Sequence, residues 1–313
     1  MKIPALLCGK NAMEEAIIEA PKSKQSTEPL ENYTEEQWDI EISPKSSLFD
    51  FHLKELWRYR DLLVMFIKRD IVTTYKQTVL GPLWFVIQPI LTTLTYIVIF
   101  GKIAGISTDG VPPLLFYLSG ITLWNYFSGT FTATSNTFKE NENIFGKVYF
   151  PRLIVPISKV VSGLIKFGIQ LVLLVGVYVY YLINSEAIAP SYVLLYFPAF
   201  ILVMSGLGLG AGIIFSALTT KYRDFTFLIT FGIQLLMYAT PVIYPVSIIP
   251  EKYKAFILAN PITPIMEGFR TALFGVGSFD SMHLLYAACC TLFLLFFGIL
   301  IFNRTEKTFM DTV

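Results

Sequence analysis

Long runs of apolar residues after residue 80 constrain the fold of this chain more than any other feature. A transmembrane helix needs roughly 20 mainly apolar residues, and six segments meet that length: residues 81–104, 114–137, 158–182, 191–217, 225–247 and 281–302. Of the 313 residues 54% are hydrophobic and 15% charged, whereas soluble domains carry about 25% charged residues. The sequence therefore predicts an all-α membrane protein with six transmembrane helices and excludes a soluble two-domain enzyme.

Prolines interrupt the chain around the end of the fifth predicted span. Pro241 and Pro245 should kink or end that helix, because proline lacks the amide hydrogen and clashes with the preceding turn. Residues 248–280 then hold two apolar pieces, 255–258 and 262–273, each too short to cross a bilayer. We expect two short re-entrant or interfacial helices here, since broken backbone is tolerated where protein or a water-filled cavity covers it.

Residues 1–47 form a polar, proline-containing segment with nine acids and five lysines, a net charge of −4. Such a composition cannot bury enough apolar surface to fold by itself, so a disordered cytoplasmic tail is predicted. The whole chain carries +1, so residues 48–313 carry +5. The basic charge belongs to the membrane part, and no nucleic-acid partner is indicated.

Residues 48–78 have an amphipathic helical pattern. Apolar Leu53, Leu56, Trp57, Val64, Ile67 and Ile71 recur at helical spacing, with charged residues largely on the opposite side. Such a helix suits the plane of an anionic membrane surface; packing on a soluble domain is the alternative. The residues predicted to face the interface are Trp57, Arg58, Arg60, Lys68 and Arg69.

The distribution of lysine and arginine around the spans predicts the orientation. The amphipathic segment, the second and fourth loops and the C-terminal tail together carry thirteen, whereas the opposite set of loops carries four. Both termini should therefore be cytoplasmic, with residues 248–280 outside.

Motifs for bond chemistry are lacking in the sequence. Neither Gly101-Lys102 nor Gly146-Lys147 has the upstream glycine and following hydroxyl residue of a phosphate-binding loop. His52 and His283 show no metal-ligand spacing and no partner nucleophile. The chain is therefore expected to bind no metal, ATP or other cofactor itself and to catalyse no reaction.

The positions of the carboxylates indicate where the energy source for transport lies. Between residues 81 and 302 every acid falls in a predicted loop: Asp109, Glu140, Glu142, Glu186, Asp224, Glu251, Glu267 and Asp280. Ion-coupled carriers commonly use carboxylates within their helices, so an energy source on another polypeptide is favoured. Lys166, seven residues after Lys159, is the remaining intramembrane charge, and it either snorkels to the interface or lines a pore.

Two spans carry stripes of polar and aromatic residues on one helix face. A glutamine facing lipid would be costly, so the stripes should face protein or water. Either they pack helices together, or they line a conduit whose aromatic rings meet sugar faces. The first stripe is Trp84, Gln88, Thr92 and Tyr96; the second is Phe227, Phe231, Gln234 and Tyr238.

Small residues dominate one face of the fourth span. Overlapping small-x-x-x-small pairs predict close helix packing there, within one chain or between two. The residues are Ser205, Gly206, Gly208, Gly210, Gly212 and Ser216.

In the order of these segments the chain resembles the membrane subunit of type-2 ATP-binding cassette (ABC) exporters for polysaccharides, the O-antigen and teichoic-acid group. The resemblance covers about residues 40–310. It is carried by LKELWRYRDLL with KRDIVTTYKQTVLGPLWFVIQP (residues 53–89), by IFGKVYFPRLIVPIS (144–158) and by YATPVIYPVSIIPEKYKAFILANPITPIMEGFRTALFG (238–275).

The resemblance implies a homodimer of six-span subunits with two cytoplasmic ATPase subunits that hold ATP and Mg²⁺. By the same resemblance residues 140–147 lie in the coupling helix, and residues 253–259 and 264–273 look like two external gate helices. It also favours the conduit role of the two stripes. The residues implied are Glu140, Asn143, Phe145 and Lys147 for coupling, and Tyr253, Phe256, Pro264 and Phe269 for the gate.

The sequence and the resemblance together predict a bacterial inner-membrane permease subunit that exports lipid-linked polysaccharide and has no enzymatic activity of its own. Within the same family, export of drugs or small lipids is the alternative. A membrane-embedded transferase acting on lipid-linked sugars is disfavoured because paired carboxylates or a histidine base near one membrane face are lacking.

Overall fold

A computed structural model describes residues 53–312 except 77, 146, 148–149, 185–188, 223 and 278, and every regular element in these residues is helical. The predicted tail, residues 1–47, lies outside them. The first elements are α1 (Leu53–Arg58), α2 (Arg60–Tyr75), η2 (Gly81–Leu83), α3 (Trp84–Tyr96), η3 (Ile97–Ile103), α4 (Pro113–Ser135) and α5 (Thr137–Phe145). The others are α6 (Ile154–Asn184), η4 (Tyr192–Tyr196), α7 (Phe197–Lys221), α8 (Phe225–Tyr238), η5 (Val246–Ile248), α9 (Glu251–Leu258), α10 (Ile262–Phe274) and α11 (Ser281–Thr312).

Four helical segments in the described residues are long and apolar enough to cross a membrane: Gly81–Ile103, Ile154–Asn184, Tyr192–Lys221 and Ser281–Thr305. They correspond to the first, third, fourth and sixth predicted spans. The second predicted span is α4, which has 23 residues but is rich in serine, threonine and aromatic side chains. The fifth is α8, which ends at Tyr238, before Pro241, and has 14 residues instead of the predicted 23. The crossings by α4 and α8 stay predictions.

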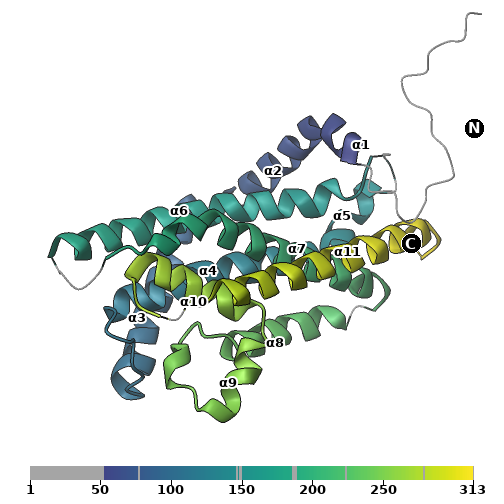
Figure 1. The fold of residues 1–313 in the computed structure, drawn as a ribbon. Helices are drawn as coiled ribbons and strands as arrows, with labels where there is room; N and C mark the ends of the chain where they lie inside the picture. Colours follow the sequence, from purple (N-terminus) through teal and green to yellow (C-terminus); the bar gives the residue numbers. More distant parts are fainter. Residues whose placement is uncertain are drawn as a thin grey trace, which may run out of the picture. The chain divides into compact units, whose positions relative to one another are not determined.

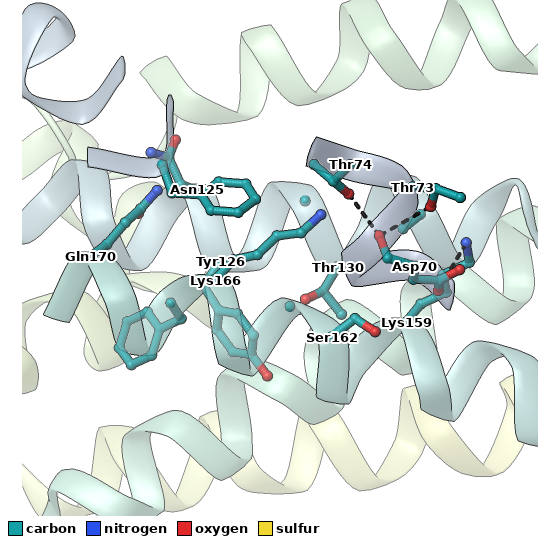
Figure 2. A pocket seen from close by; sticks show the side chains of 15 residues that line it. Asp70, Thr73, Thr74, Asn125, Tyr126, Thr130, Lys159, Ser162, Lys166 and Gln170 are labelled. Carbon is teal, nitrogen blue, oxygen red and sulfur yellow. Dashed lines mark hydrogen bonds and ion pairs between the residues drawn. The ribbon is translucent and has the colours of Figure 1, made fainter. Parts of the chain in front are cut away.

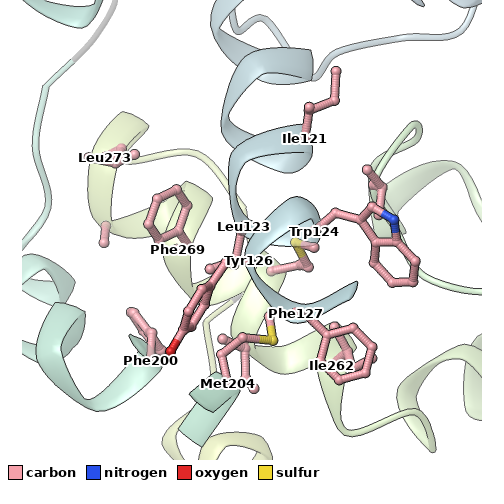
Figure 3. Packing of buried hydrophobic residues seen from close by; sticks show 14 of the residues in the cluster. Ile121, Leu123, Trp124, Tyr126, Phe127, Phe200, Met204, Ile262, Phe269 and Leu273 are labelled. Carbon is pink, nitrogen blue, oxygen red and sulfur yellow. The ribbon is translucent and has the colours of Figure 1, made fainter. Parts of the chain in front are cut away.

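Helix α4 forms the centre of the bundle, with 16 of its residues buried. Figure 1 shows the long helices α6, α7 and α11 running beside one another. Figure 3 shows buried side chains of α4, α7 and α10 in one hydrophobic cluster, among them Phe127, Met204 and Phe269. The central position of α4 agrees with its composition, because packing against other helices keeps its many hydroxyl groups away from lipid.

Glycines hold α7 close to two of its neighbours. A Cβ on Gly210 would lie 2.9 Å from the backbone of Leu294 and Leu295 in α11, and one on Gly212 would lie 2.6 Å from Thr134 Cβ in α4. These distances leave no room for a methyl group. The predicted close packing of the small-residue face is therefore confirmed within one chain.

The N-terminal amphipathic segment is helical, and one side of it packs against the rest of the chain. It divides at Tyr59 into α1 and α2. Phe66 is buried with Phe138, Phe145, Phe150 and Phe302, and Leu56, Tyr59, Leu62 and Leu63 pack against this cluster. In contrast, Trp57 is 72% and Val64 47% exposed. The helical spacing predicted the helix. Which of its sides packs against α5 and α6 depends on the tertiary structure, which helical spacing alone does not show.

Helices α9 and α10 occupy the segment where two short helices were predicted. All 13 residues of α10 are buried; they pack against α4, α7, α11 and η4. Gly275, in the left-handed conformation at φ 69°, ends the helix, as glycine commonly does because it lacks a Cβ. Helix α10 is therefore covered by protein, whereas α9 has no buried residue. Their positions relative to the membrane stay predictions.

Candidate functional site

A polar cavity of about 250 Å³ lies between α2, α3, α4 and α6. Two of these helices come from segments that the sequence predicted to be interfacial or pore-lining. Figure 2 shows the lysine side chains of α6 reaching into the space beside α2 and α4. The main residues that line the cavity are Asp70, Thr73 and Thr74 of α2, Phe85 of α3, Asn125 and Thr130 of α4, and Lys159, Ser162, Lys166 and Gln170 of α6.

Lys159 connects three helices at one end of this cavity. Its Nζ lies 3.2 Å from Asp70 Oδ2 of α2 and 3.2 Å from Glu140 Oε2 of α5. The Lys159 and Asp70 side chains are 12% and 11% exposed, whereas Glu140 is half exposed. Burial strengthens the attraction between charges, so the Lys159–Asp70 pair is the stronger constraint. The Lys159 ammonium is therefore held by two carboxylates within the chain.

Arg69 extends the same connection. Its guanidinium donates to Asp70 Oδ1 at 3.1 Å and to Asn141 Oδ1 of α5 at 3.1 Å, and lies 4.6 Å from the ring centroid of Phe66. Arg69 is thus half-buried between α2 and α5, whereas Trp57, Arg58, Arg60 and Lys68 are exposed. The interfacial position of these five residues stays a prediction.

Lys166 has a different environment from Lys159. Its Nζ lies 5.5 Å from the ring centroid of Phe85, and within the described part of the chain it has no hydrogen-bond or ion-pair partner. Nearby Ser162 is 3% exposed, and its Oγ likewise bonds to no described residue. The cavity thus combines one free ammonium group with a buried, unused hydroxyl.

The two polar and aromatic stripes lie on α3 and α8 and face outward in the single chain. Trp84, Gln88, Phe227, Phe231, Gln234 and Tyr238 are exposed, and Thr92 and Tyr96 are half-buried. The stripes approach each other where Tyr96 Oη lies 3.7 Å from Met237 Sδ. Most of the stripe residues therefore do not pack within one subunit, which leaves them available to a partner, a substrate or lipid.

The predicted coupling residues, in α5 and directly after it, separate into two groups. Glu140, Asn143 and Lys147 are exposed. Phe145 is 3% exposed and packs with Phe138 and Phe150, and α5 is kinked at Asn141. Phe145 therefore belongs to the core of this subunit, and a contact surface on α5 has to consist of its polar side chains.

A buried arginine, in a segment that the sequence predicted to lie outside the membrane, binds the backbone of the chain that follows α8. Arg270 of α10 donates from Nη1 to Pro241 O and from Nη2 to Val242 O, both at 2.7 Å. Its guanidinium lies 3.8 Å from the ring centroid of Phe116, and Glu267 Oε1 is 3.7 Å away. The sequence signal for this buried charge was the i, i+3 spacing of Glu267 and Arg270 within an otherwise apolar segment.

Glu267 lies between the fifth and sixth predicted spans, as expected, but it is buried there in α10. Of the predicted gate residues, Pro264 and Phe269 are also buried in α10, whereas Tyr253 and Phe256 on α9 are exposed. Among the described residues no group of three or more histidine, cysteine or acidic side chains could hold a metal ion.

The family follows from comparison with known sequences. The profile of the ABC-2 type transporter membrane family matches residues 61–274. The chain belongs to this family. As an ABC-2 membrane protein it is 29% identical over 254 residues to the O-antigen export system permease protein RfbA of Klebsiella pneumoniae, covering 80% of this chain and 94% of that protein.

Two further relatives of this ABC-2 family member also match over nearly their full lengths. RfbA of Myxococcus xanthus is 26% identical, with 83% of this chain and 98% of the relative covered. The polysialic acid transport protein KpsM of Escherichia coli is 22% identical, with 78% and 93% covered. The predicted family is confirmed, and its relatives are transport permeases, which agrees with a multi-pass membrane protein.

Proposed function

We propose that this chain is the transmembrane permease subunit of an ATP-driven exporter that moves lipid-linked polysaccharide across the bacterial cytoplasmic membrane. The observation that carries the proposal is the near-complete coverage of several permeases named for O-antigen or polysialic acid transport. The subunit performs no bond chemistry. ATP and Mg²⁺ belong to two cytoplasmic ATPase subunits, and both termini of the permease are cytoplasmic.

The junction of α2, α5 and α6 supports a route for coupling. In the proposed orientation α5 faces the ATPase with Glu140, Asn143 and Lys147 exposed. Lys159 and Arg69 join α5 to α2 through Asp70 and Asn141. A movement imposed on α5 by ATP binding would therefore reach α2 and the first turns of α6 through buried polar contacts rather than through a flexible loop.

The exposed stripes on α3 and α8 support a channel shared by two copies of the chain. Side chains such as Phe227 and Phe231, 78% and 59% exposed in the single chain, would be covered in a homodimer. Their rings would meet sugar faces, and Gln88 and Gln234 would bond to hydroxyl groups. Contacts of this kind are weak enough individually to release a moving chain.

Depletion of the permease in the source bacterium tests the proposal. An inducible copy replaces the native gene, and cell-surface polysaccharide and intracellular lipid-linked glycan are measured as the protein is depleted. We expect surface polysaccharide to fall while lipid-linked glycan accumulates inside. Unchanged surface polysaccharide after depletion would refute the proposal, as would ATP hydrolysis by the purified chain without a second subunit.

A further inference from the structure

We propose that the polar cavity between α2, α3, α4 and α6 holds the phosphate group of an anionic lipid headgroup. Its charge is the first argument. Three charged residues line the cavity, Asp70, Lys159 and Lys166, and Lys159 pairs with Asp70 at 3.2 Å. These three charges sum to +1, and Lys166 has no ion-pair partner among the described residues. A partly buried charge without a partner is costly, so this site favours an anion.

The available hydrogen-bond donors are the second argument. The Lys166 ammonium and the buried Ser162 hydroxyl bond to no described residue, and Figure 2 shows the ammonium in the space beside Thr74. Phosphate oxygens accept bonds from ammonium, hydroxyl and amide donors, and the amides of Asn125 and Gln170 also line the cavity.

The carboxylate of Asp70 repels an anionic ligand only weakly, because its negative charge is already paired with basic side chains. One of its carboxylate oxygens lies 3.2 Å from Lys159 Nζ and the other accepts from Arg69 Nη2 at 3.1 Å. Two basic groups therefore offset its single negative charge. Thr73 and Thr74 likewise donate their hydroxyl hydrogens to the backbone of α2, so the free ammonium of Lys166 dominates the site.

The depth of the cavity favours a lipid over a free phosphate. At a rise of about 1.5 Å per residue, Lys159 and Lys166 lie roughly 7.5 and 18 Å from the first residue of α6, which is about 46 Å long. The hydrocarbon core measures about 30 Å, so the cavity lies between headgroup level and the outer part of that core. Thr73, Thr74 and Gly129 at its rim are exposed, which leaves an entrance for a headgroup.

This inference deepens the proposed function, since a lipid-linked glycan carries phosphate. It rests on the proposed function only in assigning the cavity to the cytoplasmic leaflet of the membrane. Native mass spectrometry of the purified full-length chain tests binding without requiring export. The probes are phosphatidylglycerol, a polyprenyl pyrophosphate and inorganic pyrophosphate. We expect Lys166→Gln to weaken binding of at least one of the two lipids on the order of tenfold, the loss of one charge-assisted hydrogen bond.

Lys252→Gln is the matched control, because Lys252 is an exposed lysine of α9 that does not line the cavity. It should retain lipid binding, as should Lys166→Arg, while Ser162→Ala should weaken binding less than Lys166→Gln. If Lys166→Gln does not fold, Lys166→Arg and Ser162→Ala against Lys252→Gln decide the question. Equal lipid binding by the cavity variants and wild type, an equal loss in Lys252→Gln, or binding of inorganic pyrophosphate without either lipid would overturn the proposal.

Discussion

Arg270 shows how one side chain stabilises a break in a predicted transmembrane segment. Helix α8 ends at Tyr238 and the following chain runs through two prolines, so carbonyl groups there lack helical partners. The guanidinium of Arg270 donates to two of them, at 2.7 Å each, while its planar face covers Phe116. Arginine suits this position because its rigid fork provides several donors and a flat stacking surface.

Replacing Arg270 with methionine should therefore destabilise the subunit by about 3–5 kcal/mol, the range for breaking a buried charged contact. The substitution leaves two buried carbonyls without donors and Glu267 without its neighbouring cation. Equilibrium unfolding of the purified chain in mixed micelles measures the change. Lys254→Met is the control, because its ion pair with Glu251 is on exposed α9 and such pairs contribute about 0–1 kcal/mol. Equal stability of the two variants would contradict this role of Arg270.

At the scale of helices, the junction of α2, α5 and α6 combines an aromatic cluster with a charged one. Phe66, Phe138 and Phe145 exclude water at its centre, and Lys159 lies beside them between Asp70 and Glu140. The two ion pairs have the same length and differ in exposure. The difference in exposure should decide how strongly each pair joins its helices, because water screens the exposed charge.

Double-mutant cycles separate the two pairs. Lys159→Gln with Asp70→Asn should give a coupling energy of about 1.5–3 kcal/mol, as for hydrogen bonds to charged groups. Lys159→Gln with Glu140→Gln should give about 0.2–1 kcal/mol, as for exposed pairs. Both cycles use unfolding in mixed micelles and share one single variant, which serves as the internal control. A larger coupling to Glu140 than to Asp70 would show that exposure does not govern this junction.

Over the whole molecule, sustained apolarity predicted most helices but not their neighbours. The first, third, fourth and sixth spans follow from composition, and Pro241 correctly signalled that the fifth is interrupted. The burial of α10 was not predictable, since it depends on α4 and α7 being adjacent in three dimensions. For the same reason, the sequence left open whether Lys166 snorkels or lines a space. Its position in the cavity depends on where α2 packs against α6, which no local pattern encodes.

The stripes on α3 and α8 provide the last prediction, because they are exposed in the single chain and are proposed to line a channel in the homodimer. Phe231→Ala should lower surface polysaccharide several-fold without changing the amount of permease in the membrane. Leu202→Ala, on α7, removes another exposed apolar side chain, 71% exposed against 59% for Phe231, and should leave export unchanged. Surface polysaccharide is measured by immunoblotting of whole cells and permease by blotting of membranes. If both variants export normally, or both lose export equally, the aromatic stripe does not contact the transported chain, and exposure on α8 reflects contact with lipid instead.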